Sequence, residues 1–209
     1  MSRSLDRERL IILEGGSGVG KTTVTKGLRE LLPPDWSFYR EPGGTGFGDA
    51  MRDAVQGIHD YDVDPLAAFM AYSASRANLV ALEILPVLGK GMGVVVDRWW
   101  YSSYAYQGGD KVDKELITSV SMAVTRGLVP GVVLHYDLLP EIGMARKKGC
   151  ADIDRFDMKE LDFHRRVRDA YLELSQKFPD FWRVIDASQT PGKVFADTVN
   201  ILKEVGMMR

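Results

Sequence analysis

Short apolar runs alternate along this chain with longer segments whose apolar residues recur at helical spacing. The runs predict five strands, at residues 10–14, 36–40, 93–98, 132–137 and 181–186. The longer segments predict helices at residues 21–32, 65–88, 114–126, 141–148, 159–177 and 191–205, the second of them kinked near Pro86. Strands that alternate with helices are typical of a parallel sheet covered on both faces. We therefore expect an α/β fold with a five-stranded parallel sheet.

A glycine-rich loop separates the first strand from the first helix. Its sequence, GGSGVGKT at residues 15–22, matches the pattern G-x-x-x-x-G-K-[ST]. Glycines let the backbone turn tightly and aim successive N–H groups at an anion, next to the positive end of the helix. Lys21 adds a charge, and Thr22 offers a hydroxyl suited to Mg²⁺. The predicted phosphate-binding residues are Gly15, Gly16, Ser17, Gly18, Val19, Gly20, Lys21, Thr22 and Thr23.

Two further strand ends are candidates for the same site. The third strand carries Asp97 at the edge where open parallel sheets bind ligands, and we expect this carboxylate to meet Mg²⁺ or its water shell opposite Thr22. A loop of Trp, Tyr and Ser residues follows it. The second strand leads into residues 41–46, where Pro42 and three glycines require an irregular backbone path. The Glu41–Pro42 peptide is a candidate for the cis form.

Composition narrows the class of protein. The 209 residues are enough for one well-buried domain, and a net charge of −2 gives no sign of a nucleic-acid-binding surface or a polybasic membrane anchor. The single cysteine, Cys150, excludes an internal disulfide and a cysteine-based metal cluster, which fits a reducing cytoplasm. The polar start and the lack of an 18-residue apolar stretch predict neither a secretory signal nor a membrane span. We expect one cytoplasmic domain over residues 1–209.

A phosphate-binding loop alone is compatible with GTPases, motor and transporter ATPases, and small-molecule kinases. The sequence has no N/T-K-x-D guanine-reading motif and no ABC-type signature. Four segments instead resemble the thymidylate kinase family of nucleoside monophosphate kinases. They are LEGGSGVGKTT at 13–23, REPGGT at 40–45, SRANL at 75–79 with DRWWYSSYAYQG at 97–108, and DRFD at 154–157 with FHRRVRDAYLEL at 163–174.

The resemblance implies a P-loop kinase fold with a short lid at about residues 146–157, and a homodimer. It implies that the γ-phosphoryl group of ATP passes to dTMP, giving dTDP and ADP, with Mg²⁺ on the ATP phosphates. By resemblance, Phe69 matches the family's aromatic ring that stacks on thymine, and Arg76 matches the arginine that hydrogen-bonds the base. Tyr106 resembles the tyrosine that crowds the sugar 2′ position. The other implied acceptor-site residues are Glu41, Pro42, Arg52, Arg98, Ser103 and Gln107, of which Arg98 and Arg52 would hold the phosphate.

The basic residues Arg146, Lys147, Lys148 and Arg155 resemble a lid that closes over ATP. Some members of the family carry a catalytic arginine in the phosphate-binding loop, and others carry it in the lid. Because none of the residues 16–19 is basic, the bacterial type, with the arginine in the lid, is the better match. We expect Arg155 to be this arginine, with Arg146 as the second candidate, beside Lys21, Asp97 and Arg98 in catalysis.

The sequence departs from the family pattern in two places. Ser17 stands where the family usually has an acidic residue that reaches toward the sugar 3′-hydroxyl. Trp99 and Trp100 stand where the family commonly has a smaller aromatic residue, and we expect Trp99 to reshape the acceptor pocket. Two other hypotheses therefore stay open. One is a related kinase with another or broader acceptor range, and the other is an ATP-hydrolysing switch protein without an acceptor.

Overall fold

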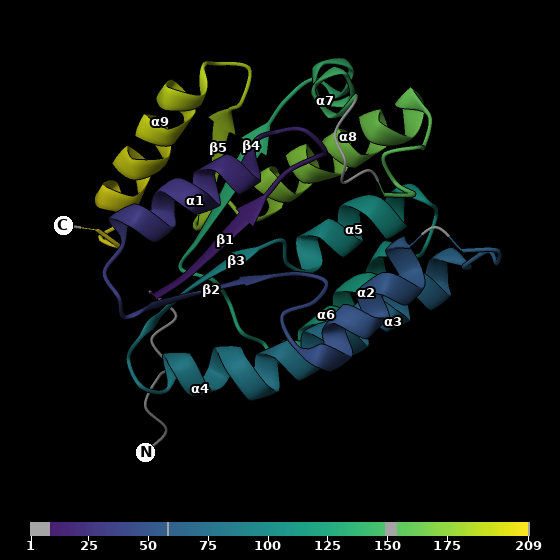
Figure 1. Ribbon diagram of the computed structural model, residues 1–209, viewed down its shortest axis with the longest axis horizontal. Helices are drawn as coiled ribbons and strands as arrows, with labels where there is room; N and C mark the ends of the chain where they lie inside the picture. The colour runs from purple at the N-terminus through teal and green to yellow at the C-terminus, as the bar shows by residue number, and fades with distance from the viewer. Residues whose placement is uncertain (1–8, 58, 149–153, 209) are drawn as a thin grey trace.

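The computed structural model describes residues 9–57, 59–148 and 154–208, and its centre is the predicted five-stranded sheet. All strands are parallel, in the order β2–β3–β1–β4–β5 (Figure 1). The elements are β1 (Leu10–Glu14), α1 (Lys21–Leu31), β2 (Trp36–Arg40), α2 (Gly46–Gln56), α3 (Pro65–Leu79), α4 (Leu85–Leu88), β3 (Gly93–Asp97), α5 (Trp100–Gly109), α6 (Lys114–Val124), β4 (Val132–Asp137), α7 (Pro140–Lys147), α8 (Leu161–Lys177), β5 (Trp182–Asp186) and α9 (Pro191–Glu204).

The two faces of the sheet are covered by different helices. Alternate residues of β1 point to opposite faces, so Ile11 and Leu13 pack with α1 and α9, whereas Leu10 and Ile12 pack with the layer formed by α3, α5, α6 and α8 (Figure 1). Both clusters are fully buried, which is why the strands read as continuous apolar runs in the sequence.

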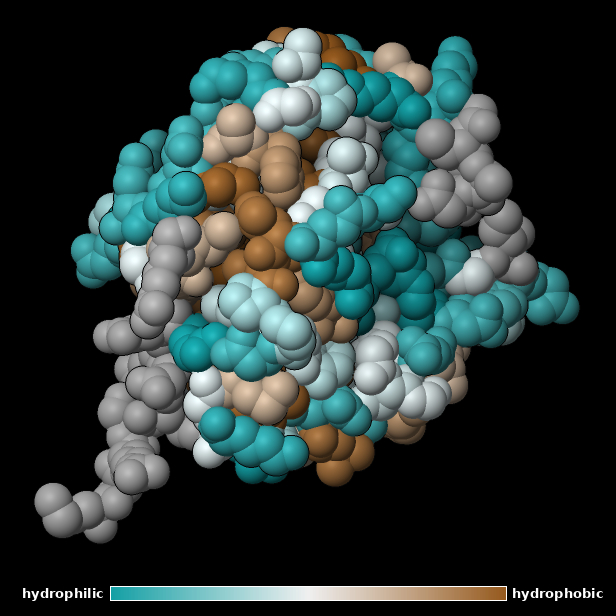
Figure 2. Space-filling view, turned by 60° about the vertical axis from the view of Figure 1, so that its left-hand side comes forward, coloured by the Kyte–Doolittle hydropathy of each residue, from teal (hydrophilic) through white to brown (hydrophobic). Residues whose placement is uncertain are grey.

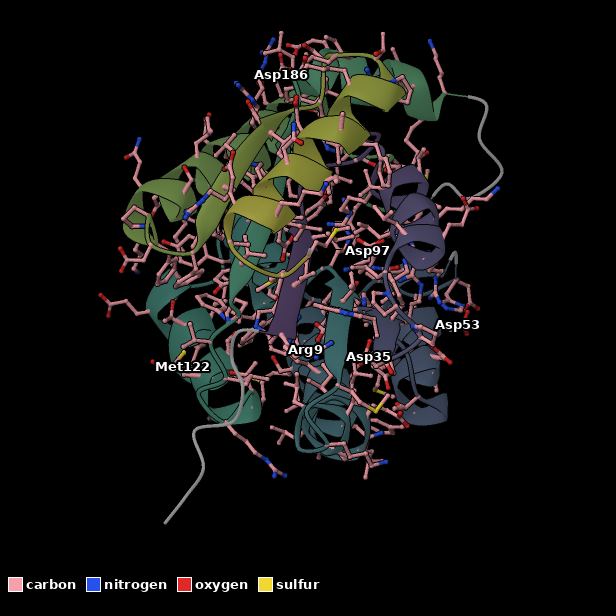
Figure 3. The ribbon with its side chains drawn as sticks, turned by 90° about the vertical axis from the view of Figure 1, so that its left-hand side faces the viewer. Arg9, Asp35, Asp53, Asp97, Met122 and Asp186 are labelled. Carbon is pink, nitrogen blue, oxygen red and sulfur yellow. The ribbon has the colours of Figure 1, made fainter. Side chains whose placement is uncertain are left out.

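The strand register brings chemically active residues to one edge of the sheet. Leu13 of β1 and Arg40 of β2 both lie opposite Asp97 at the carboxyl end of β3, and Glu14 lies opposite His135 of β4. At the other edge, just before β1 and β2, Arg9 Nη2 and Asp35 Oδ2 form an ion pair at 2.6 Å (Figure 3). The carboxyl edge is therefore the one that presents the candidate site.

Three segments differ from the sequence-based expectation. Helix α2 was missed because its glycines obscure a helical pattern, although Thr45 caps it by accepting a hydrogen bond from Gly48 N. The aromatic segment after β3 is not a loop but helix α5, whose first turn is capped by a residue from another strand rather than locally. The interruption of the long second helix is a π-helical segment, Val80–Ile84, just before Pro86.

The surface of the described residues is mixed. One face shows a band of hydrophobic residues bordered by hydrophilic ones (Figure 2). Elsewhere Leu66 and Met70 on α3 and Leu116 and Met122 on α6 are exposed. No helix within the described ranges combines the length and apolar character needed to cross a membrane.

Candidate active site

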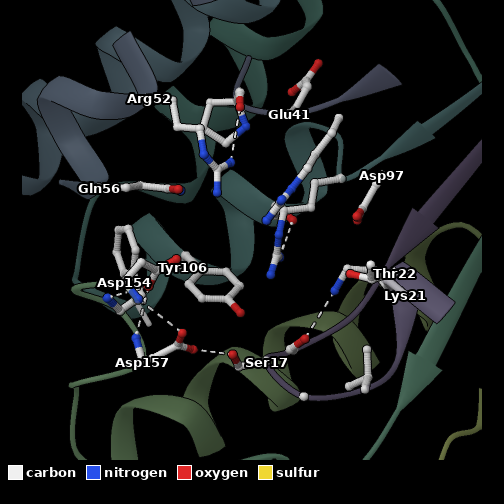
Figure 4. Close-up of a pocket in the computed structure, with 18 of the residues that line it drawn as sticks. Ser17, Lys21, Thr22, Glu41, Arg52, Gln56, Asp97, Tyr106, Asp154 and Asp157 are labelled. Carbon is white, nitrogen blue, oxygen red and sulfur yellow. Dashed lines mark hydrogen bonds between the residues drawn. The ribbon is translucent and has the colours of Figure 1, made fainter. Parts of the chain in front are cut away.

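A pocket of about 520 Å³ opens at the carboxyl edge of the sheet, a volume typical of small-molecule sites. Its wall is built from the phosphate-binding loop, the loop after β2, helices α2, α3 and α5, and the lid segment (Figure 4). The sequence-predicted residues on this wall are Gly16, Ser17, Gly18, Val19, Gly20, Lys21, Thr22, Thr23, Glu41, Pro42, Arg52, Arg76, Asp97, Arg98, Ser103, Tyr106, Gln107 and Arg146. Gly15, Phe69 and Arg155 are not on it.

The phosphate-binding loop wraps around the side chain of Lys21. Gly20, at the N-cap of α1, has φ 94°, a conformation that glycine adopts without a steric penalty. Lys21 Nζ donates hydrogen bonds to the carbonyl oxygens of Gly15 at 2.9 Å and Gly16 at 3.2 Å. Burial, together with the charge of the neighbouring Arg98, lowers the pKa of Lys21 to about 7. An anionic phosphate would favour the charged ammonium and compete for these donors.

The phosphate-binding loop also touches the first helix of the lid region. A Cβ on Gly18 would lie 2.2 Å from Gly143 O, and a Cβ on Gly143 would lie 2.4 Å from Ser17 O. Both distances are far below a van der Waals contact. Helix α7 is therefore seated directly on the loop, with backbone against backbone.

Thr22 and Asp97 both line the pocket, as a shared metal site would require. Asp97 is buried, and its Oδ1 atom has no hydrogen-bond partner among the described residues. A buried carboxylate oxygen without a partner is costly, so this atom is available to a cation or to water held by one. Carboxylate and hydroxyl oxygens fit Mg²⁺, which binds through few protein ligands and keeps several waters.

Three arginines gather on the acceptor side of the pocket. Arg98 Nη1 donates to Gly15 O at 3.3 Å and to Ser102 Oγ at 3.1 Å. Arg52 Nη1 donates to Pro42 O at 3.2 Å, while burial and the nearby Arg40 and Arg98 lower the pKa of Arg52. Like charges held this close suit a doubly charged phosphate. Arg40 was not predicted, although its place just before Glu41 at a strand end was a usable signal.

A buried ion pair lies beside these arginines. Arg76 Nε donates to Glu41 Oε2 at 2.5 Å, and Arg76 Nη2 donates to Ser103 Oγ at 3.3 Å. Burial raises the pKa of Glu41 to about 7 despite the arginine. Arg76 Nη1 is buried and unpartnered within the described ranges. The guanidinium is thus fixed by two neighbours and keeps one N–H group for a ligand.

The aromatic residue of α3 that lines the pocket is Tyr72, not Phe69. Phe69 is fully buried in the core, whereas Tyr72 lies one helical turn before Arg76 and shares its face. The Tyr72 hydroxyl and Gln56 Oε1 are both buried without partners in the part of the chain that is described. Phe69, which the resemblance matched to the stacking ring, lies two helical turns before Arg76 and is a core residue outside the pocket wall.

Two further aromatic residues shape the pocket. The guanidinium carbon of Arg98 lies 5.1 Å from the centre of the Tyr106 ring, whose edge packs against Phe156 at 5.6 Å. Trp99 is fully buried in the pocket wall, and its indole nitrogen has no partner among the described residues. Tyr106 therefore stands between the arginine cluster and the lid.

Two segments of the described part of the lid line the pocket, the end of α7 and, apart from Arg155, residues 154–157. Arg146, at the end of α7, lines the pocket and donates to Gly18 O at 3.4 Å and to Ala187 O at 3.1 Å. The guanidinium carbon of Arg155 instead lies 5.0 Å from the centre of the Phe156 ring. Asp157 accepts a hydrogen bond from Ser17 and pairs with Lys147 Nζ at 3.2 Å. Cys150 and the rest of residues 149–153 lie outside the described residues.

Comparison with known proteins places this pocket in a family. The family model for thymidylate kinase matches residues 13–198, which include every element that forms the pocket. The chain belongs to the thymidylate kinase family. A thymidylate kinase of Pediococcus pentosaceus is 36% identical over 202 residues, covering 93% of this chain and 97% of that protein. One from Carboxydothermus hydrogenoformans is 37% identical over 204 residues, covering 94% and 98%.

A solved thymidylate kinase structure has the same fold. The enzyme from Ehrlichia chaffeensis superposes with a TM-score of 0.77 at 26% identity, covering 92% of this chain and 97% of that one. The P-loop kinase fold predicted from the sequence is therefore confirmed. Members of the thymidylate kinase family are ATP-dependent nucleoside monophosphate kinases, so the chain is an enzyme of this class.

Proposed function

We propose that this protein transfers the γ-phosphoryl group of ATP to the 5′-phosphate of dTMP, giving dTDP and ADP. The observation that carries this proposal is a single pocket with two different anion sites. The phosphate-binding loop with Lys21 forms one, and Arg40, Arg52 and Arg98 form the other. A protein that only hydrolysed ATP would have no use for the second site.

The residues divide into a donor half and an acceptor half. The loop amides and Lys21 would hold the β- and γ-phosphates of ATP, and Thr22 with Asp97 would hold Mg²⁺. When bound, the ion supplies positive charge to the oxygens of the transferred group. Arg98 and Arg52 would hold the acceptor phosphate in line with it, and no covalent intermediate is needed because positioning and charge neutralisation carry this chemistry.

The thymine base would lie between Tyr72 and Arg76. A tyrosine ring offers a flat surface for stacking, and Arg76 Nη1 offers a donor that matches a base carbonyl oxygen. Ser103 and Gln107 line the same wall, Glu41 and Pro42 lie beside the ion pair, and Tyr106 would face the sugar. Arg146 would stabilise the transferred phosphoryl group, in preference to Arg155, because only Arg146 lines the pocket.

An assay of ADP formation with each nucleoside and deoxynucleoside monophosphate tests the proposal. We expect turnover with dTMP and little with dCMP or dGMP. Equal turnover of all acceptors would overturn the thymidylate assignment, and acceptor-independent hydrolysis at the same rate would favour a switch protein.

The departure at Trp99 motivates one second candidate, a kinase with a broader acceptor range, although the comparisons with known proteins do not favour it. Trp99 is part of the pocket wall, and its unpartnered indole N–H is a donor that a different acceptor could use. Trp99→Phe removes only that donor and some bulk. If acceptor preference in the same panel changes with this variant, Trp99 selects the acceptor.

We also propose a cytoplasmic homodimer with one domain per chain. Leu66 and Met70 on α3 and Leu116 and Met122 on α6 are exposed, and these two helices pack together. Exposed apolar residues of this kind suit contact with a second copy. Met70→Glu with Met122→Glu should give a monomer by light scattering. Matched substitutions at exposed Ile142 and Met158, away from this face, should not.

A further inference from the structure

Glu14, the last residue of β1, is a fully buried carboxylate that does not line the pocket. Four donors surround it. Its Oε1 atom accepts from the backbone N–H groups of Trp99 at 2.8 Å and Ser102 at 3.2 Å. Its Oε2 atom accepts from Ser102 Oγ at 2.7 Å and from the Tyr171 hydroxyl at 2.8 Å. Nothing in the proposed chemistry so far uses this group.

Two of these four bonds lead to Arg98. Trp99 N is the amide that directly follows Arg98, and Arg98 has φ 74°, in the left-handed region that disfavours a side chain. Ser102 Oγ, which donates to the carboxylate, also accepts from Arg98 Nη1 at 3.1 Å. Glu14 therefore holds Arg98 twice, through the backbone behind it and through the hydroxyl beside its guanidinium.

The same carboxylate also caps the N-terminus of α5 by accepting from backbone amides there. No local side chain caps this helix. Glu14 accepts instead from the N-cap amide of Trp99 and from Ser102 N, which it shares with Trp99 O at 3.0 Å. A negative charge at a helix N-terminus is favourable, and hydrogen bonds to an ionised acceptor are stronger than neutral ones. The cap therefore holds the turn that contains Arg98 against helix α5, which contains Ser102 and Tyr106.

The pKa of Glu14 is raised overall. Burial raises its pKa, while the neighbouring Arg98 and the hydrogen bonds from Ser102, Trp99 and Tyr171 oppose that rise. This buried carboxylate lies beside Arg98, one of two arginines in the described ranges, with Arg126, that have a left-handed backbone. An uncharged residue of similar size could fill the space but would hold the turn less firmly.

We propose that Glu14 is a positioning residue for acceptor binding, which fixes the left-handed Arg98 so that its guanidinium faces the acceptor phosphate. The inference rests on the proposed role of Arg98. It predicts that loss of the Glu14 charge weakens acceptor binding and leaves the donor site intact.

Glu14→Gln tests this proposal because it should change KM for dTMP and leave KM for ATP nearly unchanged. The variant should raise KM for dTMP about tenfold, because charged hydrogen bonds are replaced by neutral ones, and change KM for ATP less than about twofold. In an Arg98→Ala background, Glu14→Gln should change KM for dTMP no further, because residues that act as one unit are not additive. An unchanged KM in the single variant, or an equal rise in both backgrounds, would overturn the inference.

Tyr136→Phe is a matched control for the loss of a buried polar contact. Its hydroxyl bonds Thr198 Oγ1 at 3.1 Å and has no link to Arg98, so both KM values should stay at the wild-type level. If Glu14→Gln does not fold, Ser102→Ala tests the same connection, since it removes the bond to Arg98 Nη1 and should raise KM for dTMP. No rise there would also overturn the inference.

The wild-type panel separates this result from a failure of the proposed function. If the wild type uses another nucleoside monophosphate, the thymidylate assignment fails. The KM of Glu14→Gln relative to that of the wild type is then measured with that acceptor, and it still decides the role of Glu14.

Discussion

Ser17 in the phosphate-binding loop donates a hydrogen bond to Asp157 in the lid segment, so two parts of the chain 140 residues apart meet at the mouth of the pocket (Figure 4). The carboxylate also pairs with Lys147. Burial alone would raise the pKa of Asp157, but the bonds from Ser17 and from Asp154 N, together with Lys147, lower it overall. The loop has no acidic residue of its own at position 17, but the lid segment brings the carboxylate of Asp157 into contact with it.

Ser17→Asp should lower kcat/KM about tenfold, because it places two carboxylates against each other and like charges repel at this distance. Adding Asp157→Asn should recover most of the loss, since only one carboxylate remains. Ser17→Asn, which has the same size without the charge, is the control and should be affected much less. Steady-state kinetics measure all three, and an active Ser17→Asp variant would contradict the argument.

Tyr72→Leu should raise KM for dTMP at least about fivefold, because a base that stacks on an aromatic ring gains about 1–3 kcal/mol. KM for ATP should not change. The matched variant Phe69→Leu should instead lower the free energy of unfolding by about 1 kcal/mol with both KM values unchanged, since Phe69 is a core residue. If Phe69→Leu alone raised KM for dTMP, the assignment of Tyr72 would be wrong.

The pKa of about 7 for Lys21 predicts that ATP binding takes up a proton. At pH 8 the buried amine is mostly neutral in the free protein and charged beside phosphate, so uptake should approach about one proton, and it should be small at pH 6. Calorimetry in two buffers of different ionisation enthalpy measures it. Lys21→Met should remove this uptake, and Lys26→Met, an exposed lysine on the same helix, should keep it.

Without nucleotide, the same lowered pKa of Lys21 makes the free energy of unfolding depend on pH. The unfolded chain binds more protons than the folded one between about pH 7 and pH 10, since a free lysine titrates near 10.4. The contribution of Lys21 to the free energy of unfolding should therefore rise with pH across this range. A chemical denaturation series should show a smaller rise for Lys21→Met than for wild type.

Arg146→Ala should lower kcat by at least about 100-fold, because an arginine on the transferred phosphoryl group contributes strongly to this type of reaction. Arg155→Ala should change kcat less than about fivefold, since its guanidinium rests on Phe156 outside the pocket wall. Single-turnover kinetics with both substrates saturating measure the chemical step. The reverse order of effects would show that the lid moves Arg155 inward during the reaction.

The sheet was predictable because buried parallel strands leave long apolar runs, and each of the five strands occurs close to its expected range. Helix α5 was not, because its cap comes from Glu14, 85 residues earlier than Trp99, and local sequence carries no trace of that. Helix α2 was hidden by glycines at positions 46 and 48. Elements that depend on nearby residues can be predicted from the sequence, whereas a helix cap that comes from a distant residue cannot.

The site shows the same division. The phosphate-binding loop follows a spacing that is set by its own backbone, and all of its predicted residues except Gly15 line the pocket. Tyr72 was also within reach of the sequence, because it lies one helical turn from Arg76 whereas Phe69 lies two turns away. The choice between Arg146 and Arg155 was not, because it depends on how α7 and the following segment sit against the loop.

The glycine pair Gly18 and Gly143 constrains how this protein can vary. Neither position accepts even a methyl group while the other backbone stays in place, so a change at either one requires α7 to move away from the loop. The start of the lid region is in effect anchored to the donor site, and any opening must take place farther along the chain. A library randomised at both positions and selected for growth should therefore return glycine at each, and homologues could exchange lids only together with their loops.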